Sequence, residues 1–200
     1  RTFFGNFTPE LTAPPVNKEA AGEYFQVVDS PEEADAALCF ITSPISMGYE
    51  NGYQPITLQY RPYLAESARA EGITGKGSYL GRTNTCANEA DLDMVTEARR
   101  QMGEKPVIVS IAMKNPTVLA ELEPYADAIL VNFGVSSKAP FDILAGNFEP
   151  SGRLPAILPK DMETVERHCE DLPFDYEAYV DSQGNAYEFG FGLNFSGVIK

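Results

Sequence analysis

Two short, almost unbroken apolar runs, at residues 106–112 and 128–131, limit the folds open to this chain. Both runs are rich in β-branched side chains and only a few residues long, which suits strands buried on both faces of a sheet. They lie within a span of about thirty residues, the length of a βαβ unit, so the two strands should be parallel. Between them, Asn115 and Pro116 suit the cap and first turn of a short helix over residues 115–122.

The alternation of helix and strand continues on both sides of this unit. Upstream, the predicted elements are, in chain order, a short helix at 17–24, a strand at 25–28, a capped helical turn at 29–35 and a second buried strand at 36–41. Downstream we expect a short helix at 140–145 and a short strand at 156–158. The predicted fold class is therefore α/β: a single domain in which helices flank a mainly parallel sheet, an α/β sandwich.

Residues 88–102 give the clearest helix signal in the chain. Asn88 suits the N-cap, acidic side chains fill the first turn, and Gly103 lies just past the end, where a left-handed residue is favoured. The apolar residues fall on one stripe: Leu92, Val95, Ala98 and Met102. We expect this stripe to face the sheet.

The formal net charge of −14 excludes more partners than it identifies. Nucleic acids and anionic membrane surfaces call for a basic face, so neither is expected as a partner. A neutral ligand such as a sugar remains compatible. The sequence contains no run of eighteen apolar residues that would span a membrane. It begins at Arg1 without a charged-then-apolar leader, so either a signal has been removed or the chain is part of a longer polypeptide.

The residues usually found in cofactor sites are sparse. The three cysteines, Cys39, Cys86 and Cys169, are widely spaced, and no pair has metal-ligand spacing. No phosphate-binding glycine motif follows a strand, so we expect neither metal nor nucleotide cofactor. The single histidine, His168, lies in an acidic segment without a positioned nucleophile, which favours a surface role.

Residues 42–85 have the weakest periodicity and contain five tyrosines. A long irregular segment in a compact domain is usually functional or disordered. Tyrosines favour the first option, because their flat, partly polar rings suit sugars or a protein partner.

Two motifs carry a resemblance to a known family. Residues 144–155 read Leu-Ala-Gly-Asn-Phe-Glu-Pro-Ser-Gly-Arg-Leu-Pro, and residues 189–195 read Phe-Gly-Phe-Gly-Leu-Asn-Phe. Together, in this order and spacing, they resemble the C-terminal α/β domain of glycoside hydrolase family 3, over roughly residues 25–200. From the residues alone, the glycines permit tight turns and Arg153 could pair with a nearby carboxylate.

The resemblance implies a retaining, β-glucosidase-like enzyme that hydrolyses O-glycosyl bonds. In that family an N-terminal (β/α)8 barrel supplies an aspartate nucleophile, and the C-terminal domain often lends a glutamate acid/base from a loop. We expect residues 1–200 to be such a C-terminal domain without its barrel. The isolated chain should then be inactive, because the retaining mechanism needs two carboxyl groups flanking the bond.

The resemblance also points to candidate site residues. Many family members carry Ser-Gly-Glu-Gly-Tyr just after the strand that is here 36–41, and in this chain Met47 takes the place of that glutamate. Glu50, in the same loop, is the expected acid/base, and Glu66 and Glu71 have less support. The expected sugar-stacking residues are Tyr49, Tyr53 and Tyr60.

Met47 keeps a second interpretation open, in which the chain is a non-catalytic carbohydrate-binding or interaction module that has lost the acid/base. A flavodoxin-like ligand-binding domain that matches the motifs by accident is a third. By resemblance alone, we expect a secreted or periplasmic protein.

Overall fold

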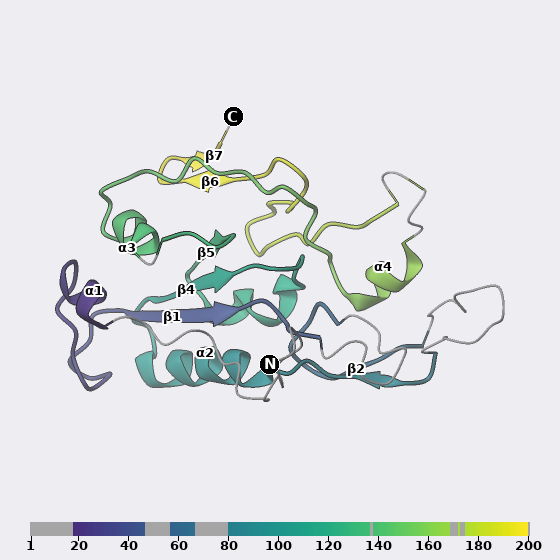
Figure 1. Ribbon diagram of the computed structural model, residues 1–200, viewed down its shortest axis with the longest axis horizontal. Coiled ribbons are helices and arrows are strands. Elements are labelled where there is room, and N and C mark those ends of the chain that lie inside the picture. The colour runs from purple at the N-terminus through teal and green to yellow at the C-terminus, as the bar shows by residue number, and fades with distance from the viewer. Residues whose placement is uncertain are drawn as a thin grey trace, which may run out of the picture.

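A three-stranded parallel sheet lies at the centre of the fold, in the order β1-β4-β5. The computed structural model describes residues 18–46, 57–66, 80–136, 138–168, 172 and 175–199. The strands are β1 (Ala37–Thr42), β4 (Val107–Ala112) and β5 (Ala128–Asn132), with Ala37 opposite Val107 and Ile108 opposite Ala128. The parallel pairing predicted for the two apolar runs is confirmed (Figure 1).

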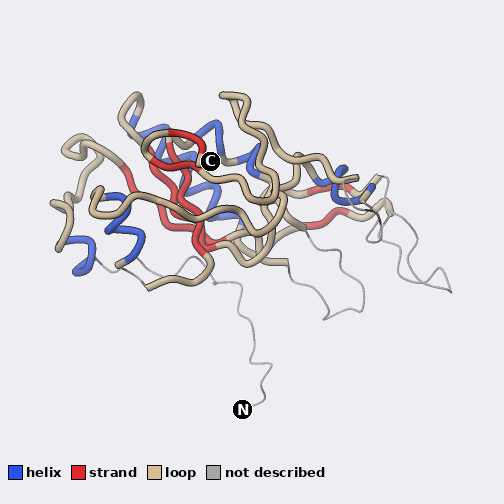
Figure 2. Tube along the Cα trace, turned by 90° about the horizontal axis from the view of Figure 1, so that it is seen from above, coloured by secondary structure: helices blue, strands red, loops and turns tan. Residues whose placement is uncertain are grey.

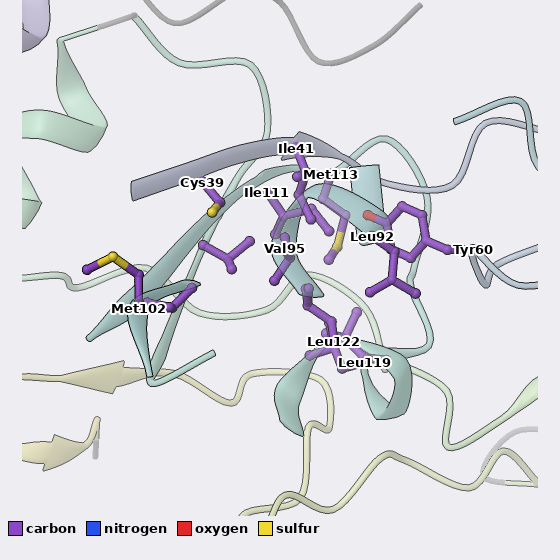
Figure 3. Close-up of a cluster of buried hydrophobic side chains, with 13 residues drawn as sticks. Cys39, Ile41, Tyr60, Leu92, Val95, Met102, Ile111, Met113, Leu119 and Leu122 are labelled. Carbon is purple, nitrogen blue, oxygen red and sulfur yellow. The ribbon is translucent and has the colours of Figure 1, made fainter. Parts of the chain in front are cut away.

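One face of the sheet packs against helix α2 (Glu89–Met102), which lies below β1 in Figure 1. The helix buries Leu92, Val95 and Met102, as its apolar stripe predicts, and it ends at Gly103, where φ is +60°. Figure 3 shows these side chains meeting residues from the strands, among them Ile41. This contact is the main hydrophobic core.

The opposite face of the sheet carries an aromatic cluster. Neighbouring strand residues point to opposite faces, so Phe40 faces away from Ile41 and away from α2. Its ring lies 5.4 Å from that of Phe141 on helix α3 (Ala139–Leu144), measured between centroids. Tyr24 and Phe25, just after helix α1 (Lys18–Gly22), pack on the same Phe141 ring. Helices therefore flank both faces of the sheet, as the predicted α/β class requires.

Short elements complete the described residues. They are β2 (Tyr63–Leu64), β3 (Thr83–Asn84), the 3₁₀ helices η1 (Leu119–Glu121) and η2 (Glu123–Tyr125), α4 (Met162–Arg167), β6 (Leu193–Asn194) and β7 (Gly197–Val198). The pairs β2–β3 and β6–β7 are antiparallel. Seen from above in Figure 2, long stretches of loop surround the compact sheet. Within the described part of the chain, no helix is long and apolar enough to cross a membrane.

The helix predicted over residues 115–122 is wrong. Val118 is extended (φ −69°, ψ 105°), and its N–H donates to the Leu58 carbonyl at 2.8 Å instead of entering a helical bond. Only the two short 3₁₀ helices follow, and Pro124 in η2 lacks the N–H that a longer helix would need. The crossover between β4 and β5 therefore contains no α-helix.

The strand predicted at 25–28 is also wrong, because Phe25 packs against Phe141 and the segment joins no sheet. Residues 29–35 form turns without a helix, and the Lys105 ammonium donates to three of their carbonyls. The strand predicted at 156–158 is absent. Only an isolated bridge, between Pro159 and Ala178, forms beside it.

Candidate functional site

The carboxyl edge of the parallel sheet brings together segments that are far apart in sequence. In open α/β sheets, ligands bind outside the carboxyl ends of the strands. Here β1 runs into residues 43–46, and β4 runs into residues 113–118. Ser43 joins them: its N–H donates to the Ala112 carbonyl at 3.1 Å, and its Oγ accepts the Lys114 N–H at 2.9 Å. This edge is where a functional loop after β1 would be supported.

A buried polar pair at the start of α2 holds the backbone that leaves β1. Asp91 Oδ2 accepts the Thr42 N–H at 3.0 Å and the Asn88 side-chain amide at 2.9 Å. Asn88 Oδ1 accepts the Ile45 N–H at 2.8 Å, while its Nδ2 donates to the carbonyls of Thr42 and Ser43 at 3.0 and 3.3 Å. Asn88 and Asp91 are each only 3% exposed. We call these two residues the Asn88–Asp91 pair.

Asn88 precedes α2 as predicted, but it is not a side-chain cap. Its side chain makes no capping hydrogen bond to the helix, because its oxygen is used by Ile45. The sequence has Asn88 and Asp91 three residues apart, but the same spacing is typical of an ordinary helix start, so it does not indicate the contact with β1. Only the fold shows that both side chains reach a strand more than forty residues earlier.

The segment between residues 46 and 57 has its two ends tied together. Ser46 Oγ donates to the Thr57 carbonyl at 3.0 Å and accepts the Thr57 N–H at 2.9 Å. Just beyond, the Glu121 carboxylate accepts the N–H groups of Tyr60 and Arg61 at 2.6 and 3.0 Å. Burial raises the pKa of Glu121, and these two bonds oppose the rise. The role of Glu121 had no signal in the sequence, since an acidic residue on a short helix has many possible partners.

Tyr60 belongs to the core and has no exposed ring face. Its side chain is fully buried, and its hydroxyl donates to the Thr42 carbonyl at 2.8 Å. Burial, followed by the nearby Asp91 charge, raises the pKa of this phenol. Figure 3 shows its ring next to Leu92, within the cluster of buried apolar side chains. The predicted sugar contact of Tyr60 is therefore corrected, because a buried ring cannot stack on a ligand.

The other predicted site residues have different placements. Glu50, Tyr49, Tyr53 and Met47 lie outside the described residues, as does Glu71. Glu66 is described and exposed.

His168 lies at the end of α4 and contacts the Asp175 carboxylate through Nδ1. Its ring also meets that of Tyr176 edge-on, with centroids 5.0 Å apart. The side chain of His168 is one-third exposed. This placement agrees with the predicted surface role.

The two family-like motifs pack directly against each other. Leu154 donates its N–H to the Phe191 carbonyl at 2.7 Å, and Gly190 donates to the Leu154 carbonyl at 2.9 Å. A Cβ at Gly192 would lie 2.5 Å from the Gly152 carbonyl oxygen, so only glycine fits there without movement. Arg153 is exposed and forms no ion pair with any residue that the structure describes, contrary to the predicted local pairing. The motifs thus join two segments of the fold.

Two cavities flank the sheet. A cavity of about 200 Å³ lies at the carboxyl edge, between Asn115, Phe133 and Leu154. A larger cavity, of about 960 Å³, lies at the opposite edge of the sheet, beside Phe25 and Leu38. It does not include the residues that follow β1 and β4. We place the candidate site at the carboxyl edge despite the smaller volume, because the buried polar pair and the loop ends meet there. No group of His, Cys, Asp or Glu within the described ranges could hold a metal ion.

Comparison with known proteins finds one matching family and several related proteins. Residues 15–195 match the family described as the glycosyl hydrolase family 3 C-terminal domain. The chain is 39% identical over 166 residues to beta-glucosidase C of Emericella nidulans, covering 82% of the chain and 22% of that protein. It is 32% identical over 172 residues to a probable beta-glucosidase C of Aspergillus flavus, covering 86% and 22%.

A bacterial relative is more distant. The periplasmic beta-glucosidase/beta-xylosidase of Dickeya chrysanthemi is 27% identical over 169 residues, covering 84% of the chain and 21% of that protein. The chain thus spans about a fifth of the length of these curated relatives. From the family match over most of the chain, together with the parallel sheet, we conclude that this chain belongs to the C-terminal domain family of the family 3 glycosyl hydrolases.

Proposed function

We propose that residues 1–200 act as the C-terminal domain of a retaining glycoside hydrolase that cleaves the O-glycosyl bonds of β-glucosides or related sugars. The observation that carries this proposal is the family match over residues 15–195, with relatives named as beta-glucosidases. The net charge of −14 agrees with a neutral sugar substrate and argues against nucleic acid.

The domain needs a partner domain to complete the chemistry. The relatives are several times longer than the aligned part, which leaves room for a separate (β/α)8 barrel. In retaining enzymes the two carboxyl groups stand about 5–5.5 Å apart on either side of the scissile bond. We assign the nucleophile to the barrel, and to this domain the loop that covers the site.

Within this domain, Glu50 is the proposed acid/base. In the sequence it falls between Ser46 and Thr57, two residues that bond each other. Burial against apolar or like-charged neighbours after the barrel docks would raise its pKa, as a general acid requires. Tyr49 and Tyr53, in the same segment, are the proposed sugar-stacking residues.

The test is hydrolysis of an aryl β-glucoside by the full polypeptide, with Glu50→Gln beside the parent. Loss of a general acid/base lowers kcat by roughly 10²–10⁴-fold, so we expect a fall in that range. Glu104→Gln is the matched control, because Glu104 is exposed just after α2, at the other end of the sheet. A Glu50→Gln variant as active as the parent would remove Glu50 from the mechanism.

The alternative function is a non-catalytic carbohydrate-binding or interaction module, and Met47 in place of the usual glutamate favours it. A methionine side chain cannot donate a proton to a leaving group. In that case the full polypeptide would leave the aryl glucoside intact while still binding a β-glucoside.

We also propose export to the periplasm or the cell exterior. The support is the Dickeya chrysanthemi relative, which is named as periplasmic. A signal peptide at the start of the full gene product would bear this out, and its absence would count against it.

A further inference from the structure

We propose that the outer edge of β1 is a docking site for one further β-strand, supplied by a segment of the longer polypeptide outside residues 1–200. The incoming segment is extended and apolar, and it lengthens the sheet beyond β1. The inference rests on the chain being one domain of a longer polypeptide, as proposed above. It does not depend on any catalytic residue of the chain.

The outer edge of β1 carries backbone groups that no described residue bonds. In a parallel pair, alternate residues direct their N–H and C=O toward the neighbouring strand. The Ala37 N–H donates to the Pro106 carbonyl at 2.9 Å, so the odd-numbered residues of β1 face β4. Leu38 and Phe40 therefore direct both groups away from β4, and within the described ranges neither has a hydrogen-bond partner on that side. Thr42, the next residue that faces outward, already has both groups bonded.

The cavity of about 960 Å³ lies along this outer edge. Its apolar lining includes residues of β1 (Leu38, Phe40), of α2 (Ala98, Met102) and of α3 (Phe141, Leu144). Because α2 and α3 cover opposite faces of the sheet, the cavity continues the sheet layer between them. A strand placed there would be buried on both faces, as the strands of parallel sheets are.

The charges around the cavity narrow the choice of occupant. Three exposed carboxylates line it, those of Asp29, Glu33 and Asp35. They favour a segment with a basic residue beside its apolar run. They disfavour a second copy of this chain, because two molecules of net charge −14 repel each other.

The edge also lacks the features that prevent strand pairing. Natural proteins block an exposed strand edge with proline or charged side chains, or else they cover it. β1 reads Ala-Leu-Cys-Phe-Ile-Thr and contains neither proline nor charge. The chain spans about a fifth of the length of its curated relatives, so most of such a polypeptide lies outside residues 1–200. A segment of the same polypeptide has a high effective concentration at this edge, which favours it over a separate peptide.

The first experiment measures amide hydrogen exchange, residue by residue, in the full polypeptide. We expect the N–H groups of Leu38 and Phe40 to exchange roughly 100-fold more slowly than freely exposed amides, because each donates to the added strand. The Ile41 N–H is the protected reference, since it faces β4. Rapid exchange at Leu38 and Phe40 beside a protected Ile41 would overturn the inference.

The second experiment identifies the segment that fills the cavity. Gln101 is exposed on α2 and lines the cavity, so a photo-reactive side chain there, in the variant Gln101→p-benzoylphenylalanine, reaches the occupant. Arg100→p-benzoylphenylalanine is the matched control, because the Arg100 side chain is 72% exposed on the same helix but does not line the cavity. We expect the position 101 variant of the full polypeptide to cross-link to one peptide from outside residues 1–200, and the position 100 variant not to yield that peptide.

The other outcomes of the cross-linking each contradict the proposal. A cross-link within residues 1–200, for example to residues 25–28, which also line the cavity, would show that the chain covers its own edge. A cross-linked dimer would assign the edge to a second copy, and the absence of any product from position 101 would show an open cavity. Neither experiment requires hydrolysis, so a full polypeptide that cleaves no glucoside would refute the proposed function without changing this result.

Discussion

At Gly192 the two motif segments lie in close contact. A Cβ there would stand 2.5 Å from the Gly152 carbonyl oxygen and 3.1 Å from Ile199 Cδ1. The first neighbour is backbone and cannot rotate away. The glycine is therefore required by space, and the motif around it has a structural reason independent of catalysis.

We expect Gly192→Ala to lower the free energy of unfolding by about 1–3 kcal/mol, because the segments must separate to admit the methyl group. Gly152→Ala is the matched control, since a Cβ at Gly152 would meet nothing within 4 Å. Thermal unfolding of both variants checks this. Equal melting temperatures for the two would contradict the crowding at Gly192.

Asp127 gives a prediction for pH. The Val107 N–H, at 2.7 Å, and then the Arg99 guanidinium hold the pKa of this carboxyl below its ordinary value of 3.8. A lowered folded-state pKa means that the stabilisation is complete above the ordinary value and is lost as pH falls through the folded value. The side chain is 55% exposed, so the effect should stay below about 1 kcal/mol.

The measurement is the melting temperature of the parent and of Asp127→Asn, from about pH 7 to about pH 3. The parent should melt higher near neutrality, and the difference should shrink below about pH 3.8 as its carboxyl takes up a proton. A difference that stays constant over this range would show that the charge of Asp127 plays no part.

Among the elements, α2 was predictable because every local signal agreed: acidic residues at its start, basic residues at its end, a glycine beyond and one apolar stripe. The segment at 115–122 was not, because its outcome depends on a distant partner. The N–H of Val118 bonds to Leu58, about sixty residues away, and no local pattern indicates that. In this segment, the hydrogen bond between Val118 and Leu58 outweighs the local preference for a helix.

The short apolar runs also include one segment that was predicted correctly and one that was not. The run predicted at 36–41 forms β1 (Ala37–Thr42) because β4 pairs with that strand along its whole length. The run at 25–28 has similar residues but no sheet neighbour, and Phe25 is used in the aromatic cluster around Phe141. Sequence periodicity therefore identified apolar segments well, yet it could not say which of them would pair.

The contact between α2 and the sheet should dominate stability. Leu92 is 2% exposed in this contact, so Leu92→Ala should cost about 2–5 kcal/mol through lost burial and a residual cavity. Met94, two residues on, is 43% exposed, and Met94→Ala should change stability by less than about 0.5 kcal/mol. Chemical denaturation of both variants checks the difference, and similar midpoints would contradict a core on this face.

For the molecule as a whole, the sequence predicted the fold class and the family more fully than the site. The two motifs identified the family, and in this fold they bond to each other through Leu154 and Phe191. Glu50 stays a prediction, because it lies outside the described residues. The hydrogen bonds of the Asn88–Asp91 pair could not be predicted, since they depend on where β1 ends in space.

We propose that this chain contributes one part of an active site whose nucleophile lies in another domain. The direct measurement is hydrolysis of an aryl β-glucoside by the full polypeptide and by residues 1–200 alone, with circular dichroism to show that the shorter chain is folded. We predict turnover by the full polypeptide and none by residues 1–200. Turnover by residues 1–200 alone would contradict the claim.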